Sequence, residues 1–498
     1  MELPIDAASM LGLSSGRNAP QSGVIAPGLE WQETYAAALG QEAYVWGFPW
    51  LYLTQLCWLW TSEGGRKLAE EKGLKIPWAP MNSFFHSAVL SNPNVQSGGS
   101  PNCDTLYSTA WLDLSKEPLV LSVPEIADRF YNIEMACVDS DNFAYVGTRA
   151  TGTEAGNYLI AGPGWDGPVP ADVSSILPRS RTPIAFLLGR TGVNSDASEE
   201  VQRAYDVSLG YELTPLSRWI DPNLPAEEAP KAMVPFNLDY QNPQGSWLTI
   251  NEAMTKSPPG VYPAIGQTEL ITLFATIGVG PGRRLDAQTE ATLKGLETAA
   301  TEGLALLKQM SFGRGKLVDG WNYPPLDLGR AGQHSDYITR AALQALGGII
   351  ANDPDEAVYL NCSTDAEGNP LRSDMSYTMS FEPPPAGVGY PPIVEGFHGF
   401  WSVTLYTPTY NLLEGSSHYT INSYDPKFDA RTAEGGMVIA ISPTEPANLD
   451  AGWYWLQSPS ETNESGSDFF LILRVYVPGP TVSGSQTWPP PPVRPWLP

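Results

Sequence analysis

The chain has 498 residues, more than one hydrophobic core usually holds, so we expect two or more packed units. Its 28 basic and 54 acidic side chains give a formal charge of −26, which repels nucleic acid and anionic membrane surfaces. The four cysteines lie far apart and show no CxxC or zinc-type spacing. Composition therefore favours neither a disulfide framework nor a structural metal site.

The N-terminal part is expected to be a leader followed by helix. Residues 1–30 have neither the basic start nor the apolar run of a secretory signal, and we interpret them as the disordered leader of a cytoplasmic protein. Residues 31–100 favour helix, and the aromatic stretch from Ala43 to Trp60 approaches the length of a membrane span. Pro49 and two polar residues interrupt that stretch and its flanks are not basic, so we expect a helix buried in the protein.

Two regions of alternating hydrophobicity flank a helical region. Short β-like runs and turns fill residues 101–195, and the β pattern returns in residues 353–480. Between them, residues 196–352 change to a helical period, most clearly from Asp286 to Met310. The Pro-rich residues 481–498 are expected to form an extended arm. The pattern predicts an α+β fold with two mostly antiparallel, jelly-roll-like β-sandwich units and with N-terminal and intervening helices.

The sequence SPNCDTLYSTAWLDL places a polar group directly before a predicted strand. Short polar side chains at such a point are typical of an Asx-turn, in which they bond a nearby backbone N–H. The alternative is that Asn102 and Asp104 present an amide and a carboxylate to a ligand or cation at the mouth of a β-sandwich, with Tyr107 beside them.

The strand RFYNIEMACVD ends an apolar row with a carboxylate. Period-two alternation places four apolar side chains from Tyr131 to Cys137 on one face, and Asp139 ends that row. A carboxylate buried there must be paired, bind a ligand or have a raised pKa. Arg129 and Arg149 are the expected partners, either in a structural ion pair or in a pocket shared with Asp104.

Arg474 is the single charge in FFLILRVYV, whose two faces are otherwise apolar. We expect it to be buried and either to pair with an acidic residue or to bind an anionic or carbonyl group of a ligand. In HGFWSVTLY, Ser402, Thr404 and Tyr406 share the face opposite Trp401. This polar row either lines a pocket or faces water.

The sequence offers little support for metal or nucleotide chemistry. The chain has four histidines, His86, His334, His398 and His418. They form no HxH, HExxH or other close ligand pair. We therefore predict no cofactor, and a divalent metal held by distant segments stays an open alternative. The sequence has no GxGxxG after a strand, no Walker loop and no GxSxG elbow.

Several motifs resemble known families. QEAYVWGFP, SPNCDTLYSTAWLDL, DRFYNIEMACVDSDNFAYVGTRATG and LLGRT are similar to the domain of unknown function family 1254, while GFWSVTLY, HYTINSY, WLQSP and LILRVYVPG resemble its usual C-terminal companion, family 1214. The resemblance covers roughly residues 30–480. It implies two jelly-roll β-sandwich units with intervening helices, often in oligomers, and no settled reaction. The family motifs fall on Asn102 to Ser108, Arg129 to Tyr131, Gly147 to Gly152 and Phe400 to Tyr406.

The chain also departs from the family pattern. His418-Tyr419 stands where the family often has Arg-Tyr, Glu434-Gly435-Gly436 stands where it often has Asp-Gly-Ser, and WLQSP replaces its W-L-P-x-P element. These changes suggest that a pocket beside the C-terminal unit differs from that of relatives.

These features favour an enzyme of the hydrolase, lyase or cyclase type that acts on a small, largely apolar organic molecule by acid–base chemistry, in specialised metabolism. The alternatives are a carbohydrate-binding or glycoside-cleaving β-sandwich protein and a non-catalytic assembly protein. The expected partners are a small-molecule substrate and further copies of the chain in a homo-oligomer, with no nucleic acid and no membrane. The candidate catalytic residues are Asp104, Asp139, Arg129 and Arg149, and the candidate substrate-binding residues are Asn102, Tyr107, Trp401, Tyr406, Tyr419 and Arg474.

Overall fold

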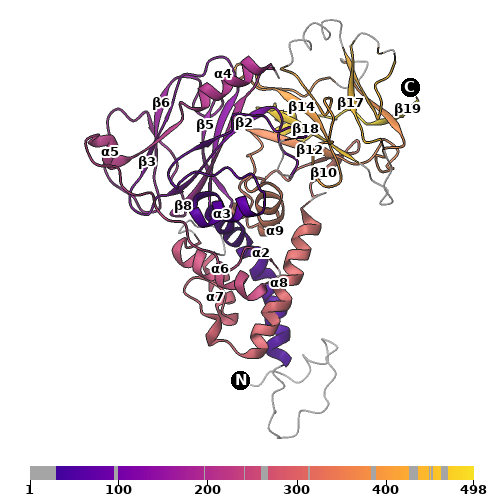
Figure 1. The fold of residues 1–498 in the computed structure, drawn as a ribbon. Coiled ribbons are helices and arrows are strands. Elements are labelled where there is room, and N and C mark those ends of the chain that lie inside the picture. The colour runs from indigo at the N-terminus through magenta and orange to yellow at the C-terminus, as the bar shows by residue number, and fades with distance from the viewer. Residues whose placement is uncertain are drawn as a thin grey trace, which may run out of the picture.

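Two β units lie side by side above a bundle of helices (Figure 1). The predicted leader, except Glu30, lies outside the described residues, as do Glu434 and Gly435 of the divergent turn. The computed structural model describes residues 30–94, 99–195, 197–240, 242–259, 267–311, 314–382, 389–424, 436–447, 449, 452–460 and 469–497.

The bundle is built on a pair of long helices, α2 (Glu30–Thr61) and α8 (Glu290–Met310). Their backbones lie close together because small residues face each other: a Cβ atom on Gly295 would lie 2.3 Å from the carbonyl oxygen of Glu33. Much of the aromatic stretch of α2 is buried in the core of this bundle. Within the described ranges, no helix is long and apolar enough to cross a membrane.

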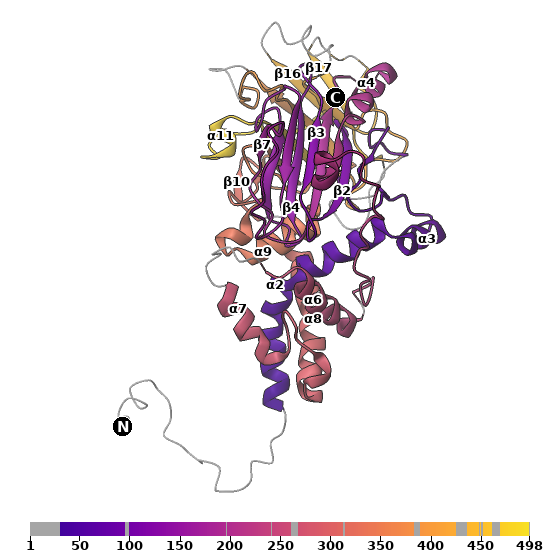
Figure 2. The same ribbon diagram turned by 90° about the vertical axis from the view of Figure 1, so that its left-hand side faces the viewer.

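The other helices cover the bundle and the edges of the sheets (Figure 2). A π-helical segment, η4 (Arg340–Leu346), replaces the regular helix that the pattern predicts between Ser335 and Ala351. The remaining helices are α3 (Glu63–Glu71), α4 (Ser198–Ser208), α5 (Leu216–Ile220), α6 (Pro243–Lys256), α7 (Gln267–Phe274), α9 (Tyr337–Thr339) and α11 (Pro480–Ser483), with short 3₁₀ helices at Ala275–Ile277, Leu285–Ala287 and Ala331–His334.

The first β unit consists of two sheets, with strand orders β1-β2-β8-β4-β5 and β7-β6-β3-β9. Apolar side chains between them form one core, which includes the predicted row from Tyr131 to Cys137. The last strand of this unit lies beyond residue 195, at which the sequence pattern predicts the end of the unit. The pattern misses this strand because its partly exposed residues show no clear alternation. The strands are β1 (Phe85–His86), β2 (Thr105–Asp113), β3 (Leu119–Val123), β4 (Tyr131–Cys137), β5 (Asn142–Gly147), β6 (Gly156–Ile160), β7 (Ser175–Ile176), β8 (Ile184–Gly192) and β9 (Glu212–Pro215).

The second β unit has the strand orders β10-β11-β12-β18-β14-β15 and β17-β16-β13-β19. Strands β10 and β11 form a hairpin that the sequence pattern does not predict. Its tight turn forms because Asp319 and Gly320 both adopt positive φ, 48° and 84°. The Pro-rich tail adds the edge strand β19, paired with β13. The strands are β10 (Lys316–Val318), β11 (Trp321–Tyr323), β12 (Ala357–Cys362), β13 (Ser376–Phe381), β14 (Trp401–Tyr406), β15 (Thr420–Asn422), β16 (Met437–Ser442), β17 (Trp453–Gln457), β18 (Phe470–Tyr476) and β19 (Arg494–Trp496).

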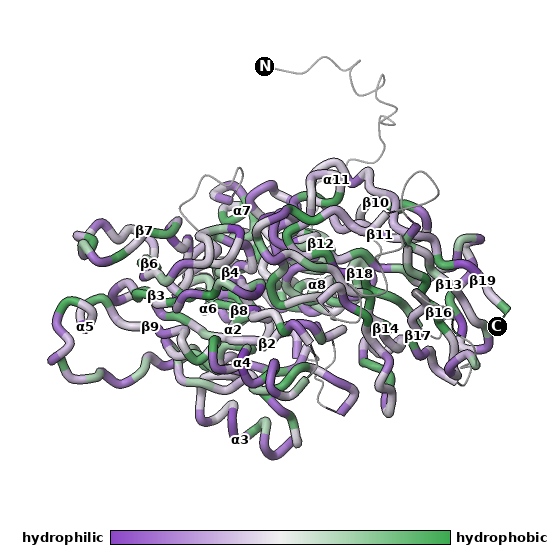
Figure 3. The backbone as a smooth tube through the Cα atoms, turned by 90° about the horizontal axis from the view of Figure 1, so that it is seen from above, coloured by the Kyte–Doolittle hydropathy of each residue, from purple (hydrophilic) through white to green (hydrophobic). Residues whose placement is uncertain are grey.

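The four sheets follow one another across the molecule when it is seen from above (Figure 3). The sheets containing β3 and β16 are the outer ones, and those containing β8 and β18 are the inner ones. The predicted α+β fold, with two sandwich-like units and with N-terminal and intervening helices, is therefore confirmed. The inner sheets meet where the two units join, and this contact contains half of the candidate residues.

Candidate functional site

Polar side chains fill the contact between the two inner sheets, and we call this set the interdomain polar layer. Hydrogen bonds cross it from one unit to the other, for example from Asn132 to Asn352. Most of its members are buried, although Tyr107, Tyr359 and Asn422 keep some accessible surface. The members are Asn102, Asp104, Tyr107, Asn132, Glu134 and Arg190 from the first unit, and Asn352, Tyr359, Ser402, Tyr406, Asn422, Arg474 and Tyr476 from the second unit and the segment before it.

Strand register places the first unit's contribution on one face of its inner sheet. Arg190 lies between Tyr107 and Asn132 in one cross-strand row. Its Nη1 donates to Oε2 of Glu134 at 2.7 Å and to Oδ1 of Asn352 at 3.3 Å. Burial raises the pKa of Glu134, and the adjacent Arg190 cation opposes that shift. The opposite face of these strands is apolar core, so the alternation that builds the sandwich also turns these charges toward the second unit.

Arg474 occupies the corresponding position in the second unit, between Tyr359 and Ser402. It is buried, as expected, and its Nη2 donates to the carbonyl oxygen of Ser100 at 2.9 Å and to Oη of Tyr406 at 2.8 Å. Among the described residues no carboxylate lies within ion-pair distance of Arg474, so the expected acidic partner is absent there. Instead of a carboxylate, the Arg474 guanidinium contacts neutral oxygens and the rings of two tyrosines. The ring centroids of Tyr359 and Tyr406 lie 5.4 and 5.5 Å from the guanidinium carbon.

Asn102 forms the predicted Asx-turn, and Asp104 ties the two units together. Oδ1 of Asn102 accepts a hydrogen bond from the backbone N–H of Asp104 at 2.6 Å. The Asp104 carboxylate accepts from Oγ of Ser402 at 2.6 Å and from Nδ2 of Asn422 at 3.1 Å. Burial raises the pKa of Asp104, while those two donors and the charge of Arg474 oppose the shift.

The tyrosine hydroxyl groups of the layer have more protons than acceptors. The hydroxyl oxygens of Tyr359 and Tyr476 lie 3.2 Å apart, and each accepts from an asparagine amide, Asn352 and Asn102 respectively. Each hydroxyl carries one proton, so one of the two protons fills the contact between them and the other has no acceptor among the described residues. Burial raises the pKa of the nearby Tyr107 hydroxyl, while the charges of Arg190 and Arg474 and a hydrogen bond with the backbone of Asn102 oppose the shift.

Further buried polar atoms in the layer lack a partner in the described part of the chain. Two are donors, the Nε atoms of Arg190 and Arg474. Two are acceptors, Oδ1 of Asn132 and Oε1 of Glu134. A buried group without a partner is costly, so such atoms mark places where a ligand or water can bind.

The predicted charge partners of Asp104 are wrong. Arg129 forms ion pairs with Asp128 at 2.8 Å and Glu200 at 2.9 Å, next to helix α4. Arg149 instead pairs with Glu356, at the edge of the interdomain polar layer. Sequence proximity suggested these pairings, but both arginines lie outside the strands, and the tertiary structure brings them to other carboxylates.

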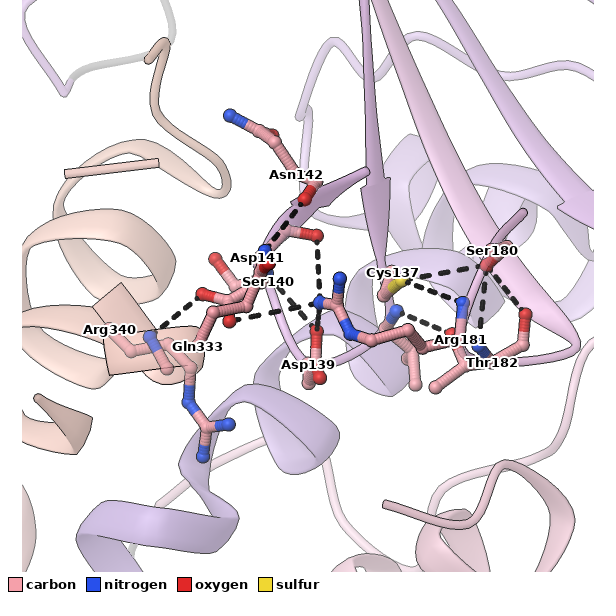
Figure 4. A network of polar contacts seen from close by, with 12 residues as sticks. Cys137, Asp139, Ser140, Asp141, Asn142, Ser180, Arg181, Thr182, Gln333 and Arg340 are labelled. Carbon is pink, nitrogen blue, oxygen red and sulfur yellow. Dashed lines mark hydrogen bonds and ion pairs between the residues drawn. The ribbon is translucent and has the colours of Figure 1, made fainter. Parts of the chain in front are cut away.

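Asp139 also lies outside the layer, in a network at the turn between β4 and β5 (Figure 4). Its Oδ1 accepts from Arg181 at 3.1 Å, so neither Arg129 nor Arg149 is its partner. Next to it, Oδ1 of Asp141 accepts from the backbone N–H of Gly332 at 3.0 Å and from Gln344 at 3.2 Å. Burial and the neighbouring Asp139 charge raise the pKa of Asp141 to about 6.

Two further predicted substrate-binding residues, Trp401 and Tyr419, are not members of the interdomain polar layer. Trp401 points into the core of the second unit rather than toward the layer. Tyr419 is part-buried and packs in a small cluster with Tyr406 and Cys103, at the border of the layer. The row of Ser402, Thr404 and Tyr406 does not face water, because all three side chains are buried in the contact between the units.

The sequence reasoning missed Glu134 and Arg190. Each is the single charge in an otherwise apolar part of a strand, which is the signal that selected Arg474. Applied to every strand, the same signal finds all three residues.

No group of three or more histidine, cysteine, aspartate or glutamate side chains that could hold a metal ion occurs in the described residues. The donors and acceptors of the layer come instead from arginine, tyrosine, asparagine and single carboxylates.

Fold and site together define an α+β protein in which two β-sandwich units enclose a buried polar layer. Residues 81–215 match the family Protein of unknown function (DUF1254), and residues 356–480 match Protein of unknown function (DUF1214). The chain therefore contains a DUF1254 domain and a DUF1214 domain, and the interdomain polar layer lies between them.

A solved structure shares this fold. The VPA0106 protein from Vibrio parahaemolyticus is 19% identical, with a TM-score of 0.64 over 93% of this chain and 100% of that chain. An uncharacterized protein from Burkholderia cenocepacia is 12% identical, with a TM-score of 0.40 over 93% of this chain and 96% of that chain, too low to support an argument. No curated protein matches the chain at a significant level.

Proposed function

We propose that the chain is an enzyme that acts on a small, largely apolar organic molecule by acid–base chemistry, with the interdomain polar layer as its active site. The observation that carries the proposal is the surplus hydroxyl proton on the Tyr359–Tyr476 pair. Burial raises the pKa of Tyr107 and Tyr476, so these phenols are protonated at neutral pH and act as donors.

These donors suit a substrate oxygen. A hydroxyl, ether or carbonyl oxygen that lies against the tyrosines receives a hydrogen bond or a proton, and the cations of Arg190 and Arg474 stabilise negative charge that develops there. Oε1 of Glu134 is an open acceptor and is the base that we propose. Both oxygens of Asp104 already have donors, so we assign Asp104 a positioning role.

The proton transfers balance within this set of residues. In an elimination or cyclisation, a tyrosine proton goes to the leaving oxygen and Glu134 takes a proton from the substrate, then returns it to the tyrosine oxygen. Hydrolysis requires one water molecule in addition. The layer supports all three reaction types.

The surroundings suit an apolar substrate body. On the same sheet face, Leu188 lies opposite Glu134 in the β-ladder, and Phe186 and Trp111 form the next row, where they pack in the core of the helical bundle. The face thus changes from charged to apolar within two strand positions. The carbohydrate alternative requires aromatic rings exposed on a sheet face or a loop. The exposed large aromatic side chains of the described residues lie in α2 and in two loops, and they are Trp31, Tyr35, Phe236 and Tyr410.

The assembly alternative requires the carboxylates to be buried in contacts between chains. Asp104 is buried in a contact within one chain, between the two β units. The homo-oligomer, the cytoplasmic location and catalysis without a cofactor stay predictions.

The test is a turnover screen with the full chain. Cyclic alcohols, lactones, enol ethers and unsaturated ketones are incubated with wild-type protein, Tyr359→Phe and Glu134→Gln, and the products are analysed by mass spectrometry. We expect each variant to lose roughly 10²–10⁴-fold in turnover, the usual contribution of a general acid or base. The matched control is Tyr35→Phe, which removes a hydroxyl from an exposed ring of α2 and should leave turnover unchanged. Equal turnover in all four proteins, or no turnover of any compound, would contradict the proposal.

A further inference from the structure

A cavity of about 380 Å³ opens on the outer side of the first β unit. Its position beside β9 and α5 is at the end of that unit away from the second β unit (Figure 1), and none of its lining residues belongs to the interdomain polar layer. The volume is within the usual range of small-molecule sites. The cavity is lined by Asp172, Leu213, Thr214, Arg218, Trp219 and Pro222.

The polar groups in this cavity are incompletely paired. Nε1 of Trp219 donates to Oδ1 of Asp172 at 3.2 Å, which orients the indole ring and leaves the other carboxylate oxygen open. Arg218 forms no hydrogen bond or ion pair with the described residues, and its Nε atom is buried without a partner. A guanidinium without a partner on a cavity wall is a donor that a ligand can use.

The charges of the cavity favour a neutral ligand. An anion would be attracted by Arg218 but repelled by Asp172 and by the formal charge of −26, and a cation would be attracted by Asp172 and by that formal charge but repelled by the adjacent Arg218, so the pair of opposite charges suits a neutral polar group best. A hydroxyl group suits both side chains, because it donates to a carboxylate and accepts from a guanidinium. The surfaces of Trp219, Leu213 and Pro222 complement a ring with an apolar C–H face.

We propose that this cavity binds a neutral, polyhydroxylated six-membered ring, such as a hexose unit, either free or at the end of a glycan. Trp219 stacks on the ring, Arg218 donates to its hydroxyl oxygens, and Asp172 and Thr214 accept from its hydroxyl protons. This site is independent of the proposed enzymatic reaction. It adds a carbohydrate-binding function to the outer side of the same β unit.

Saturation-transfer NMR with the full chain tests the proposal, with methyl glucosides, galactosides and mannosides as probes for a single ring and soluble starch, galactan and mannan as probes for a glycan. We expect saturation transfer to at least one pair of probes, and transfer to the polysaccharide but not to the glycoside would assign the site to glycans. In Trp219→Ala and Arg218→Met the affinity should fall by about tenfold or more, as for truncation of a central aromatic or arginine contact.

Two controls separate this site from the rest of the molecule. Trp31→Ala removes an exposed indole from α2, and Tyr359→Phe changes the interdomain polar layer. Both variants should bind the probes like wild type, whether or not the proposed reaction is found. No transfer to any probe, or equal transfer in wild type and Trp219→Ala, would overturn the inference. Binding of inorganic phosphate to wild type, lost in Arg218→Met, would overturn it in favour of an anion site.

Discussion

The interdomain polar layer and the network at the β4–β5 turn are both buried and both combine carboxylates with arginines, yet they differ in how completely they are paired. In the turn network, Asp139 and Asp141 accept hydrogen bonds from backbone N–H groups as well as from side chains (Figure 4). In the layer, Oε1 of Glu134 has no donor among the described residues, and the tyrosine protons outnumber their acceptors. Both the layer and the turn network contain buried charges. Unpaired hydrogen-bond donors and acceptors are therefore a better indication of a functional site than buried charge alone.

The turn network has two incompletely paired members among the described residues. Oδ1 of Asn142 lacks a partner, and so do the Nε and Nη1 atoms of Arg340. Its guanidinium carbon lies 5.3 Å from the ring centroid of Trp50 and 4.9 Å from that of Tyr337. These rings stabilise the cation through their faces. The network joins the first β unit to the helical region, which is a structural role.

The largest effect on stability is expected from Arg190→Met. It leaves Glu134 buried without its cation, at a cost of roughly 3–5 kcal/mol in the free energy of unfolding. Urea titration of the full chain measures the loss. The double variant Arg190→Met, Glu134→Leu should recover most of it, because no charge is then left unpaired. A single variant as stable as wild type would show that the pair contributes nothing to the layer.

A smaller loss is expected from Arg474→Met. Because the partners of Arg474 are neutral oxygens rather than a carboxylate, the cost should be roughly 1–3 kcal/mol. The same urea titration provides the comparison. A loss equal to that of Arg190→Met would mean that Asp104 depends on Arg474 as its counter-charge, and the two halves of the layer would then be alike.

In the turn network we expect a dependence on pH. The pKa of Asp141 is about 6 in the folded protein against an ordinary value of 3.8, so the folded state binds this proton more tightly than the unfolded state. The contribution of Asp141 to stability therefore falls as pH rises from about 4 to about 6 and is constant above that range. Melting temperatures measured across this range should fall less steeply in Asp141→Asn.

The groups that face Asp141 provide a second variant for this test. They are Asp139, Arg181, Arg340 and Gln344. Asp139→Asn removes a negative charge that raises the pKa of Asp141, so it should reduce the same slope. If the melting temperature fell with pH as steeply in Asp141→Asn and Asp139→Asn as in wild type, this pair of carboxylates would not be the source of the pH dependence.

The smallest effect on stability is expected from Asp104→Asn. The change removes a buried charge and weakens one hydrogen bond between the units, and these effects oppose each other, so the stability should change by about 1 kcal/mol or less. The turn itself is held by Asn102. Turnover in the screen should fall less than in Glu134→Gln, and a greater fall would make Asp104 the base instead.

The local sequence predicted the architecture well. Side chains alternate every two residues in a strand and return every three to four in a helix, so the two β units and the intervening helices follow from neighbouring residues alone. The same reasoning placed Arg474 inside the protein. It missed the β10–β11 hairpin although Asp319-Gly320 is a strong turn signal, because the flanking strands have only three residues each.

Sequence by itself thus determined the longer strands, their apolar faces and the burial of Arg474, because each of these depends on a few adjacent residues. Only the tertiary structure decided the partners. Asp104 meets Ser402 and Asn422, which are 298 and 318 positions away, and Asp139 meets Arg181 rather than the arginines nearer to it in sequence. Such pairs depend on strand register and on how two sheets stack, and neither is encoded in any short segment.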